Sequence, residues 1–164
     1  MGGNRQPASV PDLVRHGNVV FGMDDLVTRW VAKRIPQFHI SPGARAIGIT
    51  KGNDLVAGVV YERWNGVHVE ASIAAVPATG WASRSAMFAL FYYPFITLDC
   101  QAISVLVPSS NLASLNLATK MGFQGEAIVR FAAQDGSDLI VLKQFREQCR
   151  WLRYGQGKQG TKAA

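Results

Sequence analysis

The densest group of chemically useful side chains flanks the dipeptide Asn65-Gly66. Asn-Gly between two apolar-rich segments predicts a two-residue β-hairpin loop, because both turn positions then adopt positive φ. In that register Arg63 lies opposite His68 and Tyr61 lies opposite Glu70, and opposed residues share a face of the hairpin. The predicted polar face carries Tyr61, Arg63, His68, Glu70 and Ser72.

Glu70 lies near the middle of this face and is the first candidate for proton transfer. A partly buried glutamate has a raised pKa and can act as a general base. Tyr61 and His68 are the second-choice proton carriers. The alternative is a solvated sheet face with an exposed cluster of arginine, histidine and glutamate.

A second candidate site is the segment Pro77–Ser83, which leads from a strand into a helix that begins at Arg84. The free amides and positive dipole end of such a helix favour an anion, above all a phosphate or pyrophosphate. Arg84 adds a cation with several donors, and Ser83 is suited to cap the helix. The alternative is an ordinary connecting loop with a surface arginine, since the segment holds one glycine and no P-loop lysine.

No metal or disulfide framework is expected. Cys100 and Cys149 form no CxxC pair, and the three histidines are too scattered for a zinc site. The sequence therefore predicts two reduced, partly buried thiols.

Charge is concentrated at one end of the chain. The net charge is +6, and residues 143–164 hold six basic side chains and one acidic one, which leaves the preceding part nearly neutral. A basic end segment can contact phosphates or acidic proteins, or it can simply keep the protein soluble. A nucleic-acid contact is therefore possible but not favoured.

The elements that must position these residues follow from apolar patterns and turn signals. A length of 164 residues suits one compact domain. We predict a helix from Asp24 or Asp25 to Arg34, a three-strand meander, a helix, a strand, a second helix and a final hairpin, which makes a mixed sheet of the α+β class. The expected ranges after the first helix are strands 46–50, 55–64 and 67–75, helix 84–93, strand 102–107, a helix from Ser109 or Ser110 to Met121 ended by Gly122, and strands 127–133 and 139–145.

Membrane insertion and secretion are not expected. The richest apolar stretch, Ser85–Leu98, has about 14 residues and contains Pro94, whereas a membrane span needs about 20. The first residues lack the apolar core of a signal peptide. We therefore expect a cytoplasmic protein.

The segment from Ser109 to Phe123 resembles a known family. Asn111, Ser114 and Leu117, followed by Lys120-Met121-Gly122-Phe123, are similar to the N-x-x-S-x-x-L…K-x-G-F segment of the GNAT superfamily of acetyl-CoA-dependent N-acetyltransferases. The resemblance is closest to the branch of ribosomal-protein N-terminal acetyltransferases and small phage-encoded members. Further matching segments are Trp81-Ala82-Ser83-Arg84, Tyr93-Pro94-Phe95 and residues 138–152, and the resemblance covers about residues 45–152.

The resemblance implies the acyl-CoA N-acyltransferase fold, a GNAT-like mixed β-sheet flanked by helices. Its central strands, here 67–75 and 102–107, splay apart and admit the pantetheine arm of acetyl-CoA. The implied cofactor-binding residues are Ala74, Ala75 and Val76 at the pantetheine, Trp81, Ala82, Ser83, Arg84 and Ser85 at the pyrophosphate, and Asn111 and Ser114 near the cysteamine end.

The chain departs from the family pattern at two points. The phosphate loop is reduced, with Ala82 and Ser83 at positions where glycine and small residues are common. Ala118 stands where many members have a tyrosine that protonates the leaving thiolate. A CoA thiolate can leave without that acid, so its absence slows the reaction rather than forbidding it.

The predicted function is transfer of an acetyl group from acetyl-CoA to a primary amine, which could belong to a protein N-terminus, a lysine or a small molecule. The amine attacks directly in a ternary complex, and Glu70 removes a proton. The alternatives are a catalytically weak CoA-binding interaction module and a nucleic-acid-contacting accessory protein that uses its basic end. A homodimer through an exposed sheet edge is also possible.

The expected domain is residues 1–154. Within it, residues 1–45 form an N-terminal helical part on the acceptor side, residues 46–145 hold the sheet and the CoA-binding core, and residues 146–154 form a basic end segment. Residues 155–164 are expected to be a flexible tail.

Overall fold

The computed structural model describes residues 15–153, so the predicted flexible tail lies outside the described residues. These residues form two compact units. The N-terminal unit comprises the described residues up to Glu62 together with Ile73–Ala86, and the C-terminal unit comprises Arg63–Ser72 and the described residues from Met87 onward. The predicted domain boundaries remain a prediction.

The strands follow the order β1-β2-β3-β4-β5-β6-β8-β7, and β5 runs through both units. Strand β5 pairs with β6 in parallel, whereas the pairings β1–β2, β2–β3, β3–β4, β6–β8 and β7–β8 are antiparallel. This confirms the predicted α+β class with a mixed sheet. The strands are β1 (Arg15–His16), β2 (Val19–Val20), β3 (Arg45–Lys51), β4 (Asp54–Glu62), β5 (His68–Ala75), β6 (Ala102–Pro108), β7 (Gln124–Val129) and β8 (Leu139–Phe145), and the helices are α1 (Asp24–Ala32), α2 (Arg84–Tyr92), the π-helix η2 (Tyr93–Thr97), α3 (Leu112–Met121) and the 3-10 helix η3 (Arg146–Gln148).

Two paired glycines allow α1 to pack closely against the sheet of the N-terminal unit. Gly48 on β3 lies opposite Gly58 on β4. A Cβ built on Gly58 would lie 2.8 Å from a methyl carbon of Val31 and 3.0 Å from one of Val27, both on α1. Because neither glycine has a side chain, α1 approaches the backbone closely, and its buried face fills the core with Trp30.

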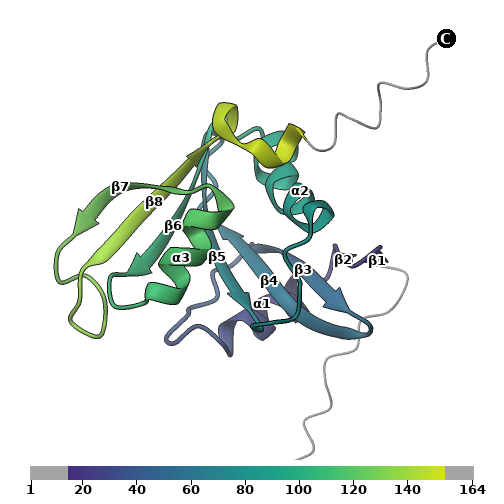
Figure 1. The fold of residues 1–164 in the computed structure, drawn as a ribbon, viewed down its shortest axis with the longest axis horizontal. Helices are drawn as coiled ribbons and strands as arrows, with labels where there is room; N and C mark the ends of the chain where they lie inside the picture. The colour runs from purple at the N-terminus through teal and green to yellow at the C-terminus, as the bar shows by residue number, and fades with distance from the viewer. Residues whose placement is uncertain (1–14, 154–164) are drawn as a thin grey trace, which may run out of the picture. The chain divides into compact units, whose positions relative to one another are not determined.

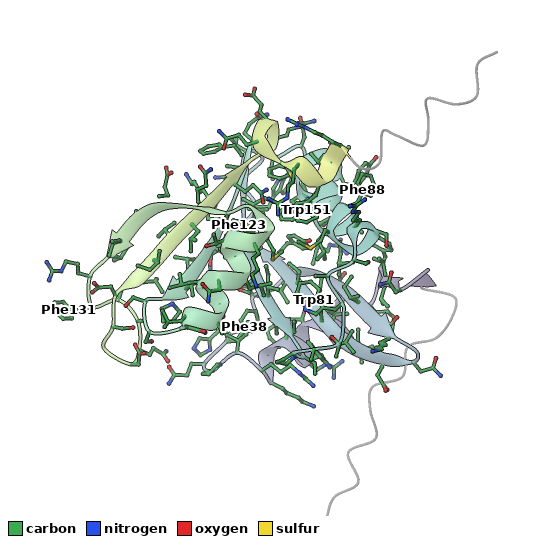
Figure 2. The ribbon with its side chains drawn as sticks, in the orientation of Figure 1. Phe38, Trp81, Phe88, Phe123, Phe131 and Trp151 are labelled. Carbon is green, nitrogen blue, oxygen red and sulfur yellow. The ribbon has the colours of Figure 1, made fainter. Side chains whose placement is uncertain are left out.

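The core of the C-terminal unit forms around aromatic rings. Phe91 lies 6.2 Å from Phe95 and 5.9 Å from Phe123, measured between ring centroids. In Figure 1 the long strands β6 and β8 lie side by side, with β7 on the outer side of β8. Trp151, labelled with Phe123 in Figure 2, donates its indole N–H to the carbonyl of Met121 at 2.7 Å. This bond ties the segment after β8 to the end of α3.

Several element boundaries confirm the sequence prediction. The final strand spans 139–145 as predicted, and Gly122 ends α3 with φ 102°. Ser83 caps α2, since its hydroxyl accepts a hydrogen bond from the amide of Ala86 at 3.2 Å.

Three local predictions are wrong. The loop between β4 and β5 spans Arg63–Val67 rather than two residues. Arg63 itself adopts φ 54°, and the side chain of Asn65 accepts hydrogen bonds from the amides of Val67 and His68. These bonds stabilise a wider turn than Asn-Gly alone requires.

The other two errors concern α3 and β7. Asn111, not Ser109 or Ser110, caps α3, because its Oδ1 accepts the amide hydrogen of Ser114 at 3.1 Å. Strand β7 begins at Gln124 and ends at Val129, earlier than the predicted 127–133, because Phe131 already has φ 54°. Neither β1 nor β2 was predicted.

Candidate functional site

A polar cluster in the C-terminal unit contains two of the three catalytic candidates, Glu70 and His68. The register pairs His68 with Ala102 and Glu70 with Ser104 across β5 and β6, and it pairs Ser104 with Lys143 across β6 and β8. Since paired residues and residues two apart share a face, His68, Glu70, Ser104 and Lys143 lie on one face of this sheet. With Arg63 we call these residues the His68 cluster.

Glu70 is held by Arg63 in a bidentate ion pair. Arg63 Nε donates to Glu70 Oε2 at 3.0 Å, and its Nη2 donates to Oε1 at 2.5 Å. The Glu70 side chain is 17% exposed, whereas the Arg63 side chain is 62% exposed. Both carboxylate oxygens therefore already accept charge-assisted hydrogen bonds from one guanidinium.

His68 is the better placed proton acceptor in the His68 cluster. Its Nε2 is hydrogen-bonded to the hydroxyl of Ser104, which is only 5% exposed. Burial lowers the pKa of His68, the charge of Lys143 lowers it further, and Glu70 opposes the shift. His68 is therefore neutral near pH 7, and a neutral imidazole can accept a proton.

The β5–β6 pairing is short. Three pairs connect the two strands, and among the described residues this ladder ends at Glu70 and Ser104. Strand β6 continues to Pro108 and remains paired with β8 throughout. The His68 cluster thus includes both residues of the last parallel pair, Glu70 and Ser104.

The predicted pyrophosphate segment lies in the N-terminal unit. Two positive φ values, 59° at Ala78 and 67° at Gly80, turn the chain between β5 and α2. The first turn of α2 holds no acidic residue, and the hydroxyls of Ser83 and Ser85 lie 3.2 Å apart. Together with Arg84 these groups form an electropositive helix start that suits an anion.

Val76, directly after β5, already has hydrogen-bond partners for both of its backbone groups. The amide of Val76 donates to the carbonyl of Val56 at 2.8 Å, and the carbonyl of Val76 accepts from the Thr79 hydroxyl at 2.9 Å. The predicted hairpin register would place Val76 opposite Leu55. The bond to Val56 therefore shifts the pairing of β4 with the end of β5 by one residue. Of the three predicted pantetheine contacts, Val76 therefore already has partners for both its backbone groups, and Ala74 and Ala75 carry that prediction.

The remaining predicted site residues are divided between the two units. Asn111 and Ser114 are joined by the bond that caps α3 in the C-terminal unit. Trp81 is 9% exposed and belongs to the buried residues, while Ala82 lies next to the capping Ser83. Tyr61 is 4% exposed in the N-terminal unit, and this burial makes it the weakest of the three proton-transfer candidates.

Sequence reasoning missed Ser104 and Lys143. Both become neighbours of His68 only through the pairing of β6 with β5 and β8, which joins segments far apart in the chain. Their signal in the sequence is a polar residue inside an otherwise apolar strand, as Ser104 is in Ala102–Pro108.

The basic end segment is partly used inside the C-terminal unit. Arg146 forms an ion pair with Asp99 at 2.5 Å, and Arg150 donates to the carbonyl of Lys120. These two cations therefore fix η3 and the following residues to the fold.

The described residues contain neither a cluster of metal-ligating side chains nor a membrane-spanning helix. No group of three or more histidine, cysteine or acidic side chains within residues 15–153 could hold a metal ion. In the same range, none of the helices has the length and apolarity to cross a membrane. Both cysteines are buried, and burial raises the pKa of each thiol.

Comparison with known proteins shows a similarity in fold alone. No family model matches the sequence, and no curated protein matches it. Among solved structures, the chain is similar to a mutant form of the spermidine N-acetyltransferase SpeG from Vibrio cholerae, with a TM-score of 0.57, 19% identity, and coverage of 70% of this chain and 72% of that chain.

Two further solved structures have a similar fold. One is an acetyltransferase of the GNAT family from Bacillus anthracis, with a TM-score of 0.53, 19% identity, and coverage of 63% of this chain and 66% of that one. The other is the Campylobacter jejuni N-acetyltransferase PseH in complex with acetyl coenzyme A, with a TM-score of 0.50, 13% identity, and coverage of 65% and 70%. The chain therefore has the acyl-CoA N-acyltransferase fold that these GNAT acetyltransferases share.

Proposed function

We propose that this protein is an acetyl-CoA-dependent N-acetyltransferase that acts on a primary amine. The observation that carries the proposal is the His68 cluster at the end of the three-pair β5–β6 ladder. The fold supports it, since PseH has the same fold and its structure is a complex with acetyl coenzyme A. A primary amine fits as the acceptor class, because SpeG is a spermidine N-acetyltransferase.

The predicted contacts with acetyl-CoA fall on three segments of the chain. The start of α2, with Ser83, Arg84 and Ser85, supplies amides and a cation for the pyrophosphate. The backbone of Ala74 and Ala75 supplies hydrogen bonds for the pantetheine arm. Asn111 and Ser114 would line its cysteamine end from the start of α3.

The chemistry then needs one proton acceptor and a positioned amine. The amine nitrogen forms a bond to the acetyl carbon while the C–S bond breaks, and the thiolate leaves with the electron pair of that bond. The nitrogen loses one proton, which His68 accepts at Nε2, directly or through the Ser104 hydroxyl. Glu70, held by Arg63, stabilises the imidazolium that results. Much of the rate comes from holding both reactants in one site.

The direct test is calorimetric titration with acetyl-CoA, followed by turnover of a panel of small amines and peptides. We expect binding at about micromolar concentration. Ser83→Asp should weaken binding by at least tenfold, because a carboxylate replaces the hydroxyl at the predicted pyrophosphate position.

Asn111 needs a matched pair of variants, because it also caps α3. Asn111→Ala removes both the cap and the amide, whereas Asn111→Asp keeps the capping oxygen. If acetyl-CoA binding fails in both while thermal stability falls only in Asn111→Ala, the contact role is supported. Absence of acetyl-CoA binding to the native protein at millimolar concentration would reject the enzyme and favour an interaction module.

A further inference from the structure

Lys143 is the cation of the His68 cluster that its neighbours hold least tightly. Among residues 15–153 its ion-pair partner is Glu126, whose Oε1 lies 3.8 Å from the Lys143 Nζ, beyond hydrogen-bond distance. Arg63, by contrast, donates two hydrogen bonds to the oxygens of Glu70. The Lys143 side chain is 30% exposed, and a lysine ammonium has three donors. Lys143 can therefore bind an anionic group that enters from solvent.

A β-bulge explains why the contact with Glu126 is long. The register passes from Gly125 opposite Leu142 to Ala127 opposite Val141, so Glu126 is the extra residue of β7. A bulge of this kind redirects a side chain and leaves the extra residue out of the ladder. The Glu126 side chain is 46% exposed, and water weakens such a pair. Lys143 thus retains most of its attraction for a second anion.

The strand order places Lys143 beside the proposed proton acceptor. The hydroxyl of Ser104 on β6 is hydrogen-bonded to Nε2 of His68, and Lys143 lies opposite Ser104 on the neighbouring strand β8. Glu126 lies one strand farther away, on β7. Neighbouring strands are about 4.8 Å apart. On this side of the sheet, the first charge that an amine at His68 meets is therefore positive.

This arrangement discriminates between classes of amine. An acceptor with a second ammonium group would bring that group toward Lys143, and like charges repel. Glu70 offers little compensation, because Arg63 already occupies both of its oxygens. A carboxylate beside the amine would instead receive a charge-assisted hydrogen bond from Lys143. Because Glu126 is close to this single ammonium, the site suits a monoanion better than a phosphate dianion.

We propose that Lys143 is a specificity-determining residue that binds a carboxylate of the acceptor. The preferred substrate is then a primary amine with a carboxylate close to it, which is found in a free α-amino acid and at the N-terminus of a peptide that begins with an acidic residue. Polyamines are disfavoured, in contrast to SpeG, which is a spermidine N-acetyltransferase. The proposal rests on the acetyltransferase function proposed above.

The test compares matched acceptors that differ in one carboxylate, at pH 8, where His68 is neutral in every variant. One pair is a free α-amino acid and its amide. The other pair is a peptide amide that begins with aspartate and the same peptide with asparagine. The measured quantity is the ratio of the two KM values within each pair. Following how this ratio changes between native protein and variant cancels the difference in pKa between the acceptor amines.

Lys143→Met should reduce the preference for the carboxylate-bearing acceptor by roughly 10- to 100-fold, because a charge-assisted hydrogen bond is lost. Lys143→Arg keeps the charge and should retain most of the preference. The control is Lys51→Met at the exposed end of β3, which should leave the ratio unchanged. A preference in one pair only would support the proposal and identify the source of the carboxylate.

Three results would count against the proposal. If the native protein acetylates spermidine better than the carboxylate-bearing amines, or if Lys143→Met leaves both ratios unchanged, the role of Lys143 is wrong while the acetyltransferase function stands. If no amine in the panel is acetylated and acetyl-CoA does not bind, the proposed function fails and this proposal fails with it.

Discussion

Arg63 and Lys143 change the roles of the two proton-transfer candidates beside them. Arg63 occupies both oxygens of Glu70, and Lys143 helps to keep the neighbouring imidazole of His68 neutral. From the sequence Glu70 is the first candidate for proton transfer, because it lies near the middle of the predicted polar face. Its ion pair with Arg63 occupies both carboxylate oxygens and leaves His68 as the better placed proton acceptor.

The pH dependence of kcat/KM distinguishes the two candidates. A histidine base works in its neutral form, so activity should rise with pH through the pKa of His68, and the midpoint of this rise should lie below pH 6.5, the ordinary pKa of histidine. Lys143→Met removes a charge that lowers this pKa and should move the limb to higher pH. Glu70→Gln removes a charge that raises it and should move the limb to lower pH while activity persists.

The controls for this profile are Lys51→Met, which should leave the limb in place, and His68→Gln, which should remove it. If Glu70→Gln abolishes turnover and His68→Gln does not, Glu70 is the base and the assignment to His68 is wrong.

At the scale of elements, three glycines determine how closely α1 and the end of α3 approach neighbouring residues. The Gly48–Gly58 pair admits α1, and Gly122 lets the chain leave α3 beside Gln144, whose Nε2 would lie 2.7 Å from a Cβ built there. A methyl group at either site meets atoms already in place. Packing, rather than turn chemistry alone, explains these glycines.

Gly58→Ala should destabilise the protein by about 1–3 kcal/mol, because the new methyl overlaps Val31 and Val27. Urea denaturation measures the loss. Adding Val31→Ala to Gly58→Ala should cost less than the sum of the two single changes, since the smaller side chain makes room for the methyl. Strict additivity would show that the overlap is not the cause.

A second element-scale contact joins the loop before α3 to the β7–β8 loop. Asp135 accepts hydrogen bonds from the hydroxyls of Ser110 and Ser137 and from the amide of Ser137. These bonds lower the pKa of Asp135 from 3.8 to about 2. A carboxylate with a lowered pKa adds stability above its unfolded pKa and loses it as pH falls through the folded one.

Asp135→Asn should therefore lower Tm at pH 5, and this difference should shrink between pH 4 and pH 2 and vanish below pH 2. Asp54→Asn, at the exposed start of β4, serves as the matched control. A Tm difference that is constant across this pH range would show that the ionised carboxylate does not hold the loops together.

At the scale of the whole molecule, local patterns predicted the elements and nonlocal pairing determined the candidate site. The run Leu139–Phe145 was predicted to the residue because an apolar segment after Asp135-Gly136 has clear ends. Strands β1 and β2 have two residues each and carry no period that a pattern could reveal. The Asn65-Gly66 signal was misleading because side-chain bonds of Asn65 support a longer loop.

The sequence predicted a polar site for proton transfer but not all of the residues that form it. His68 and Glu70 were found because they lie two apart on one strand. The neighbours that set their properties, Ser104 and Lys143, come from β6 and β8, and no local spacing links them to β5. Strand order is a property of the complete chain, so their contribution emerged only with the fold.

The left-handed backbone at Arg63 makes glycine a revealing substitution at this position. With φ 54°, a residue with a Cβ costs roughly 1–2 kcal/mol more than glycine would. Arg63→Gly therefore relieves backbone strain and removes the ion pair with Glu70 in one step. The local backbone and the charge of the candidate site are thus coupled through this one residue.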